Sequence, residues 1–234
     1  MNVSKLLKIE MWRSLKTRRF IFLYIAELIA IILSNLDSLD ETYFSITDIF
    51  LTQYLGISLT FRYVYSGIII SSHFSKDIEI GIVDTYIAVG AKKILILIGK
   101  WLCAWLEILI VVVMASITYV GFSFAFNGVS MIPLSFVQTI CLSLIPLLAN
   151  SLLLTVVDLI FLNSIITVFC AVFLIVISGL LPYDVLKWLY LGYNNPITVF
   201  LYGSYNDIFR MLVVVITSLI IFASTSVFAI YRRN

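Results

Sequence analysis

The sequence predicts an all-α protein that crosses a membrane about six times and begins with an amphipathic helix at the membrane surface. Its composition is the first reason: 62% of the 234 residues are hydrophobic, 12% are charged, and the mean hydropathy is +1.11. Soluble domains carry about 25% charged residues. So few charges could not cover the surface of a soluble fold of this length. Lipid is therefore the expected solvent for most of the chain.

The second reason is a series of long apolar runs. About 20 apolar residues in a helix cross a bilayer core roughly 30 Å thick. In lipid every backbone polar group must be bonded within its own segment, so the runs are expected to be helices. The runs cover residues 20–36, 49–73, 94–121, 133–157, 163–181 and 208–231. We divide the chain accordingly into a surface helix, 1–19, and a transmembrane domain, 20–234.

Residues 1–19 have the pattern of a helix that lies in the plane of the lipid headgroups. At 100° per residue, Val3, Leu7, Met11 and Leu15 form an apolar stripe. The opposite side carries Lys5, Lys8, Arg13, Lys16 and Arg19. A basic amphipathic helix of this kind contacts anionic lipid. A second interpretation, compatible with the first, is that the basic residues only set the topology.

The distribution of basic residues predicts the orientation. Six of the 15 precede the first run, four lie in or beside the loop between the second and third runs, and two end the chain. These 12 share one side of the six-span arrangement. The loop after the first run lies on the other side and carries Asp37, Asp40, Glu41 and Asp48 without a base. Because basic loops stay in the cytosol, both termini are expected to be cytosolic.

Few residues are suited to catalysis or ligand binding. The chain has one histidine, His73, and three widely spaced cysteines, Cys103, Cys141 and Cys170, that sit inside apolar runs. We expect these cysteines to pack as small hydrophobic side chains. The sequence has no G-x-x-x-x-G-K-[ST] phosphate loop. The prediction is a non-enzyme with no catalytic residues, no metal site, no cofactor of its own and no nucleic-acid partner.

The loop at about 74–93 is the most informative stretch. From Lys76 to Ala88 it reads KDIEIGIVDTYIA. Helical spacing places Ile78, Ile82, Val83, Tyr86 and Ile87 on one face and Asp77, Gly81, Asp84 and Ala88 on another. The pattern predicts one short amphipathic helix on the cytosolic surface. Such a helix can lie on lipid or dock into the groove of a partner. Gly99-Lys100-Trp101 then opens the third run, with lysine and tryptophan expected at the interface.

At these residues the chain resembles the permeases of ABC-2 type ABC transporters. The family pattern is an acidic-x-Glu-x-Gly motif, a hydrophobic helix, a Gly/Pro-x-basic turn, and Gly-Lys entering the third span. The matching segments are Asp77-Ile78-Glu79-Ile80-Gly81, Val83 to Val89, Gly90-Ala91-Lys92 and Gly99-Lys100. The family usually has threonine after the glycine, where this chain has Ile82. In length and in its aromatic, isoleucine-rich composition, the chain resembles small permeases of bacterial peptide exporters and bacteriocin-immunity systems.

The resemblance implies a subunit of an exporter in the bacterial plasma membrane. Two copies of a separate ATPase would carry ATP and Mg²⁺, and a second permease, identical or a sister chain, would complete the transporter. The cargo would be amphipathic peptides or lipid-like molecules. The residues expected to couple to the ATPase are Lys76, Asp77, Glu79, Gly81, Asp84 and Thr85. The alternative is that this loop is only a solvated connector.

Polar side chains inside the runs suggest an ion pair and a path. Glu27 and Arg62 lie at matching depth, and buried charges in a membrane usually pair, so we expect them to contact one another. Arg62 could instead contact an anionic group of the cargo. The family resemblance puts the second and fifth spans along the dimer seam and the translocation path. Candidate path residues are Phe50, Tyr54, Phe61, Arg62, Tyr65, Asn163, Thr167 and Ser178. Ordinary helix packing is the alternative for each.

Two other classes of protein compete with the exporter subunit. An ATP-independent secondary transporter or channel would suit a polytopic chain, but such proteins often show inverted repeats and broken helices, which the sequence does not clearly display. An intramembrane enzyme would need paired carboxylates or several histidines in adjacent spans, which the sequence does not offer.

Overall fold

The computed structural model describes residues 3–17, 19–37, 55–127, 134–180 and 205–231. Every regular element within these ranges is an α-helix, which confirms the all-α prediction. The helices are α1 (Val3–Lys16), α2 (Arg19–Asp37), α4 (Leu55–His73), α5 (Ser75–Glu79), α6 (Ile82–Ala88), α7 (Lys93–Asn127), α8 (Leu134–Phe161), α9 (Ser164–Leu180) and α12 (Tyr205–Tyr231).

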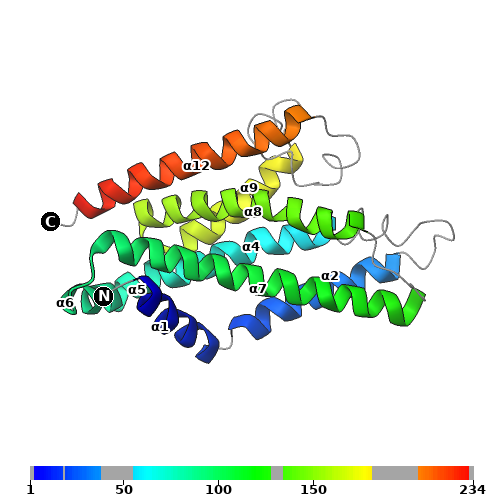
Figure 1. Cartoon of the computed structure of the whole chain (residues 1–234), viewed down its shortest axis with the longest axis horizontal. Helices are drawn as coiled ribbons and strands as arrows, with labels where there is room; N and C mark the ends of the chain where they lie inside the picture. The colour runs from blue at the N-terminus through cyan, green and yellow to red at the C-terminus, as the bar shows by residue number, and fades with distance from the viewer. Residues whose placement is uncertain (1–2, 18, 38–54, 128–133, 181–204, 232–234) are drawn as a thin grey trace.

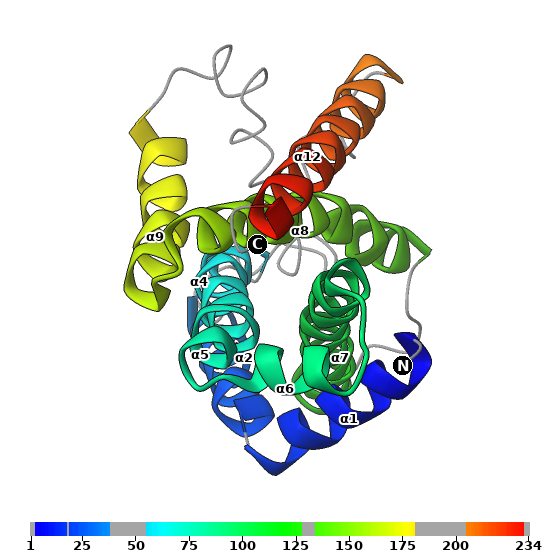
Figure 2. The same ribbon diagram turned by 90° about the vertical axis from the view of Figure 1, so that its left-hand side faces the viewer.

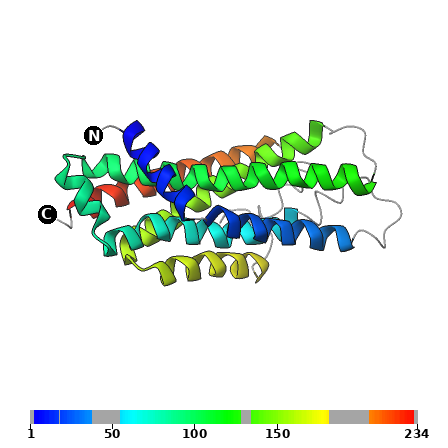
Figure 3. The same ribbon diagram turned by 90° about the horizontal axis from the view of Figure 1, so that it is seen from below.

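The long helices form an elongated bundle. Helices α2, α4, α7, α8, α9 and α12 run roughly along its long axis (Figure 1). The short helices α5 and α6 gather at one end, and the C-terminal end of α12 lies at that same end (Figures 1 and 3). We call this the α5–α6 end of the bundle. Seen end-on, α1 lies beneath α7 beside the α5–α6 turn (Figure 2).

The helix bounds follow the apolar runs closely. Helices α2, α7, α8, α9 and α12 coincide with their runs to within a few residues, while the start of the second run lies outside the described residues. By length and composition, one described helical stretch, Lys93–Phe122, could cross a membrane, with a mean hydropathy of 2.2. The other apolar stretches are shorter: Ile21–Leu33, Leu147–Phe161, Ser164–Leu174 and Val215–Ser226.

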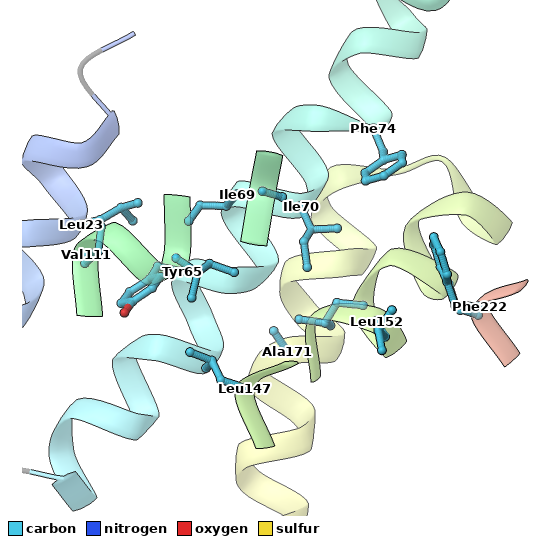
Figure 4. Packing of buried hydrophobic residues seen from close by; sticks show 14 of the residues in the cluster. Leu23, Tyr65, Ile69, Ile70, Phe74, Val111, Leu147, Leu152, Ala171 and Phe222 are labelled. Carbon is cyan, nitrogen blue, oxygen red and sulfur yellow. The ribbon is translucent and has the colours of Figure 1, made fainter. Parts of the chain in front are cut away.

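The core lies where α4 meets α7, α8 and α9. Figure 4 shows its labelled side chains, among them Ile69 and Ile70 of α4, Leu152 of α8 and Phe222 of α12. Helices α4 and α9 approach closely because α4 has a glycine there: a Cβ at Gly67 would lie 3.0 Å from the Cβ of Ala171. Small residues of this kind allow helix backbones to come together.

The outside of the bundle is apolar and much of its charge is inside. Large hydrophobic side chains are exposed along several long helices, including Phe22 (74% exposed) and Ile165 (77% exposed). Glu27, Arg62 and Glu107 are instead buried. Fully buried charged residues are uncommon unless they are paired, and Glu27 and Arg62 are paired with each other.

Helix α1 docks onto α7 through its narrow inner face. Leu6, Glu10 and Ser14 are buried there, whereas Leu15 of the predicted apolar stripe is exposed. Gly99 provides space for this contact, because a Cβ at that position would lie 2.1 Å from Cδ2 of Leu6 and would force the leucine side chain to shift. The Gly-Lys pair in the second turn of α7 therefore leaves room for α1 to lie against it.

Candidate functional site

The loop predicted as one helix consists of two. Helices α5 and α6 are separated at Gly81, whose φ of +75° lies in the left-handed region. Glycine adopts this conformation without the steric cost that other residues meet. The prediction of one continuous helix over 76–88 is therefore wrong, since periodicity does not reveal a break at a positive φ. The turn brings α6 back toward the start of α7 (Figure 2).

The tip of this helix pair exposes apolar side chains beside charged ones. Ile80 is 70% exposed and Val89 is 69% exposed. Exposed polar side chains of the same segment are Lys76, Glu79, Asp84 and Thr85. We call these six residues the docking surface. An exposed apolar patch with a charged rim is typical of a surface that contacts another molecule.

Asp77 does not belong to this surface, although it was expected among the coupling residues. Its side chain is buried, because it faces two basic residues from other helices. Arg13 Nη2 of α1 donates to Asp77 Oδ2 at 2.5 Å, and Lys100 Nζ of α7 donates to the same oxygen. The assignment of Asp77 to the docking face is therefore corrected: it holds α5 to α1 and α7.

Asp77 is part of a buried ionic cluster at the α5–α6 end. The cluster comprises six residues from four helices: Glu10, Arg13, His73, Asp77, Lys100 and Glu107. Lys100 Nζ donates to Glu10 Oε1 at 2.9 Å, so Lys100 bridges the carboxylates of Glu10 and Asp77. His73 Nε2 lies 2.5 Å from Glu107 Oε1, and its Nδ1 lies 3.6 Å from Glu10 Oε2. Lys100 is fully buried, so its ammonium faces these carboxylates and not the outside of the bundle.

The cluster strongly favours the charged state of its surface-helix members. Burial by itself would raise the pKa of Glu10, but the hydrogen bond with His73 and the charges of Lys100 and Arg13 outweigh burial and lower this pKa to about 2. Burial would lower the pKa of Arg13, but its bond with Asp77 and the charge of Glu10 raise it. Charged pairs that are largely buried in this way hold their helices in one arrangement, although the Arg13 side chain stays 26% exposed.

Helix α6 joins the cluster through one tyrosine. Tyr86 donates its hydroxyl hydrogen to Glu10 Oε1 at 2.9 Å, and the Lys100 ammonium lies 5.5 Å from the Tyr86 ring centroid. Burial and the neighbouring Glu10 carboxylate raise the pKa of Tyr86. The hydroxyl therefore stays a donor, and both helices of the loop are bonded to α1.

A second buried carboxylate ties α5 to the other side of the bundle. Asp158, near the end of α8, accepts hydrogen bonds from the Ser75 backbone N–H at 2.9 Å and from Ser75 Oγ at 2.6 Å. Thr167 Oγ1 of α9 donates to Asp158 Oδ1 at 2.5 Å. The start of α5 is thereby fixed to α8 and α9, while Asp77 fixes it to α1 and α7.

The expected contact between Glu27 and Arg62 is present. Arg62 Nε donates to Glu27 Oε1 at 2.9 Å, and both side chains are buried. Ser58 Oγ and Tyr65 OH, both from α4, also donate to this carboxylate, at 2.9 and 3.0 Å. Glu27 therefore attaches α2 to α4 with three bonds.

The candidate path residues within the described ranges make contacts inside the chain. Arg62 and Tyr65 bond to Glu27, Thr167 bonds to Asp158, and Phe61 packs against the core. Asn163 Oδ1 accepts the N–H of Ile165 at 2.9 Å and so caps α9. In this conformation Arg62, Tyr65 and Thr167 are enclosed by the chain and line no open path. Phe50, Tyr54 and the Ser178 side chain lie outside the described residues.

Sequence reasoning did not identify the ionic cluster. Glu10 and Lys100 lie 90 positions apart, so no local spacing relates them. One signal was available: Glu10 is the lone acid on a strongly basic helix, and His73, Lys100 and Glu107 interrupt apolar runs close to the same loop. Polar residues at such positions usually find partners within the protein.

Comparison with models of known protein families finds no family that matches the chain, and no curated protein sequence matches it. The geometry of the α5–α6 end is therefore the observation that bears on function.

Proposed function

We propose that the chain is the transmembrane subunit of an ATP-driven exporter, with about six spans and both termini in the cytosol of a bacterial cell. Chemical energy would come from a separate ATPase, present in two copies with ATP and Mg²⁺. A second permease, identical or a sister chain, would complete the transporter. The cargo would be an amphipathic peptide or a lipid-like molecule, as the sequence resemblance implies.

The reversed distribution of polarity supports a membrane location. Phe22 and Ile165 project outward from the bundle, while the Glu27–Arg62 pair is enclosed. Water would penalise such an exterior, because exposing apolar surface costs about 25 cal/mol per Å². Lipid removes that cost, and it makes pairing of the interior charges necessary.

The α5–α6 end carries the proposal of ATPase coupling. Its docking surface exposes Ile80 and Val89 to a partner, and the same segment is bonded inward at three points, Ser75, Asp77 and Tyr86. A push on the tip would therefore act on α1 and α7 through Asp77 and on α8 and α9 through Ser75. A solvated connector has no need of these buried attachments. The fixed attachment of an exposed tip is the single observation that favours coupling.

A photo-crosslinking amino acid at Ile80 tests the proposal. The full chain with this label would be expressed in its native host, irradiated, and purified in detergent, and the crosslinked partner would be identified by mass spectrometry. We expect a protein with a G-x-x-x-x-G-K-[ST] phosphate loop. The matched control is the same label at Ile9, an exposed apolar residue of α1 outside the docking surface.

Charge reversal at the tip gives an independent readout. Glu79→Arg changes an exposed side chain, so the yield and monodispersity of the purified chain should match the parent. Co-purification of the ATPase or export by the complete transporter should fall. If Ile80 captures no phosphate-loop protein and Glu79→Arg transports like the parent, the segment is a connector and the exporter assignment is wrong.

A further inference from the structure

Three side chains of types that bind metal ions lie together where the ionic cluster meets Cys103. His73 of α4 and two residues of α7, Cys103 and Glu107, are fully buried, and their Nε2, Sγ and carboxylate oxygen all lie within 4.8 Å of one another. We propose that these three residues bind one Zn²⁺ ion. This inference goes beyond the proposed transport function and does not depend on it.

The geometry is close to that of a tetrahedral site. Zinc binds sulfur at about 2.3 Å and nitrogen or oxygen at about 2.0–2.2 Å, so tetrahedral angles separate sulfur from oxygen by about 3.6 Å. Cys103 Sγ and Glu107 Oε1 are 3.9 Å apart, near that separation. His73 Nε2 and Glu107 Oε1 are 2.5 Å apart and share a hydrogen. The ion replaces that hydrogen, and the two atoms move apart by about 0.9 Å to reach zinc geometry.

The donor set and its helix positions favour zinc. Imidazole, thiolate and carboxylate are the ligand types that protein zinc sites use. Cys103 and Glu107 are four residues apart on α7, so one turn presents both on the same face. A ligating histidine usually offers its other ring nitrogen to a carboxylate, which orients the ring. Glu10 Oε2, 3.6 Å from His73 Nδ1, is placed for that role.

A second group of three residues, Glu10, His73 and Asp77, is a weaker candidate. It shares His73 with the first group, and its two carboxylates are already bridged by the ammonium of Lys100. A cation there would meet the positive charges of Lys100 and Arg13 at short range.

Zinc binding at this site is coupled to proton release. Protein ligands bind zinc as neutral imidazole and as thiolate, so the ion would displace the hydrogen shared by His73 and Glu107 and the hydrogen that the Cys103 thiol donates to Glu107. The ion joins α4 to α7 at the base of the α5–α6 loop.

Cobalt absorption tests the site in the purified full chain. The protein carries an affinity tag without histidine or cysteine, is stripped with EDTA in detergent, and is titrated with Co²⁺. We expect one Co²⁺ per chain, a thiolate-to-cobalt charge-transfer band, and displacement by Zn²⁺. Cys103→Ala should abolish the band, while Cys141→Ala and Cys170→Ala, the matched controls, should retain it. Glu10→Gln should weaken the affinity by about 10–100-fold.

Thermal unfolding separates loss of the site from loss of the fold. Zn²⁺ should raise the unfolding temperature of the parent and of Cys141→Ala and leave that of Cys103→Ala unchanged. Cys103→Ser keeps a small polar side chain in the same place and should behave as Cys103→Ala. A parent without a thiolate band overturns the proposal, as does a band that persists in Cys103→Ala or an equal Zn²⁺ stabilisation of all variants. In those cases the group is an ion pair only.

Discussion

Replacing Arg62 by methionine should strand a buried charge. Methionine fills similar apolar volume, but Glu27 then loses its cationic partner and keeps the hydroxyl donors of Ser58 and Tyr65. Removing one partner of a buried pair costs about 3–5 kcal/mol in soluble proteins. Single interhelical hydrogen bonds in membranes average about 0.6 kcal/mol and reach about 1.7. Glu27 is completely enclosed, so the cost of leaving its carboxylate without a cation outweighs the loss of one hydrogen bond. We therefore expect Arg62→Met to lower the free energy of unfolding by about 3 kcal/mol.

The second variant removes the stranded charge. Glu27→Gln removes the charge and keeps one carbonyl oxygen that accepts from Tyr65 or from Ser58. The double variant Glu27→Gln with Arg62→Met should therefore recover about 2 kcal/mol, within the range of coupling energies for contacting residues. Unfolding by SDS titration of the detergent-solubilised chain measures all four proteins of the cycle. Strictly additive losses would refute the pairing.

A neutral hydrogen-bonded pair that also involves α2 provides the control. Tyr24 of α2 and Thr118 of α7 share a hydroxyl–hydroxyl hydrogen bond without charge. Tyr24→Phe should therefore cost no more than the roughly 0.6–1.7 kcal/mol of ordinary interhelical bonds. An equal loss for Tyr24→Phe and Arg62→Met would show that the charge of the pair does not matter.

The remaining predictions concern the membrane topology, the docking of α1 onto α7, and the transmission of movement from the α5–α6 end to α8 and α9. A cysteine at Ser38 should label with an impermeant thiol reagent in intact cells and one at Lys92 should not; labelling at Lys92 alone reverses the proposed orientation. Gly99→Ala should clash with Leu6 and destabilise the contact between α1 and α7 by about 1–3 kcal/mol, so trypsin should cleave faster after α1. Adding Leu6→Ala should restore resistance to trypsin. Unchanged cleavage of Gly99→Ala would contradict the docking. Asp158→Asn should weaken the hydrogen bonds from α5 and α9 by about 1–3 kcal/mol. Export should fall while the ATPase is still captured at Ile80. Loss of capture would instead mean that Asp158 is needed for binding the ATPase and not for transmitting its movement.

Hydropathy predicted the helices well because the apolar segments are long and nearly uniform. The bounds of α2 differ from its apolar run by one residue at each end, and α7 continues six residues beyond its run. The contact between Glu27 and Arg62 also followed from the sequence, because two opposite charges at one depth have few other partners. These are features in which a single physical requirement, satisfying polar groups in an apolar solvent, determines the outcome.

The α5–α6 end required the structure. The break at Gly81 depends on one backbone angle that residue periodicity does not report. The burial of Asp77 depends on Arg13 and Lys100, which come from helices before and after the loop. Lysine beside tryptophan at the start of a span is a common interfacial pattern, so Lys100 was assigned to the lipid surface. Gly99 altered that outcome by admitting α1, which covers Lys100 and supplies Glu10.

The clamp of α1 onto α7 also sets an order for biogenesis. Helix α1 leaves the ribosome well before α7, and its buried glutamate has its lysine partner 90 residues later in the chain. Asp77 of α5 becomes available earlier, but until α7 has been synthesised Glu10 lacks the ammonium of Lys100. The surface helix therefore completes its docking only after the third long helix has entered the bundle. In a chain interrupted before Lys100, α1 is not bonded to α7 and is accessible to proteases. The cell's quality control would therefore distinguish an unfinished chain from a finished one.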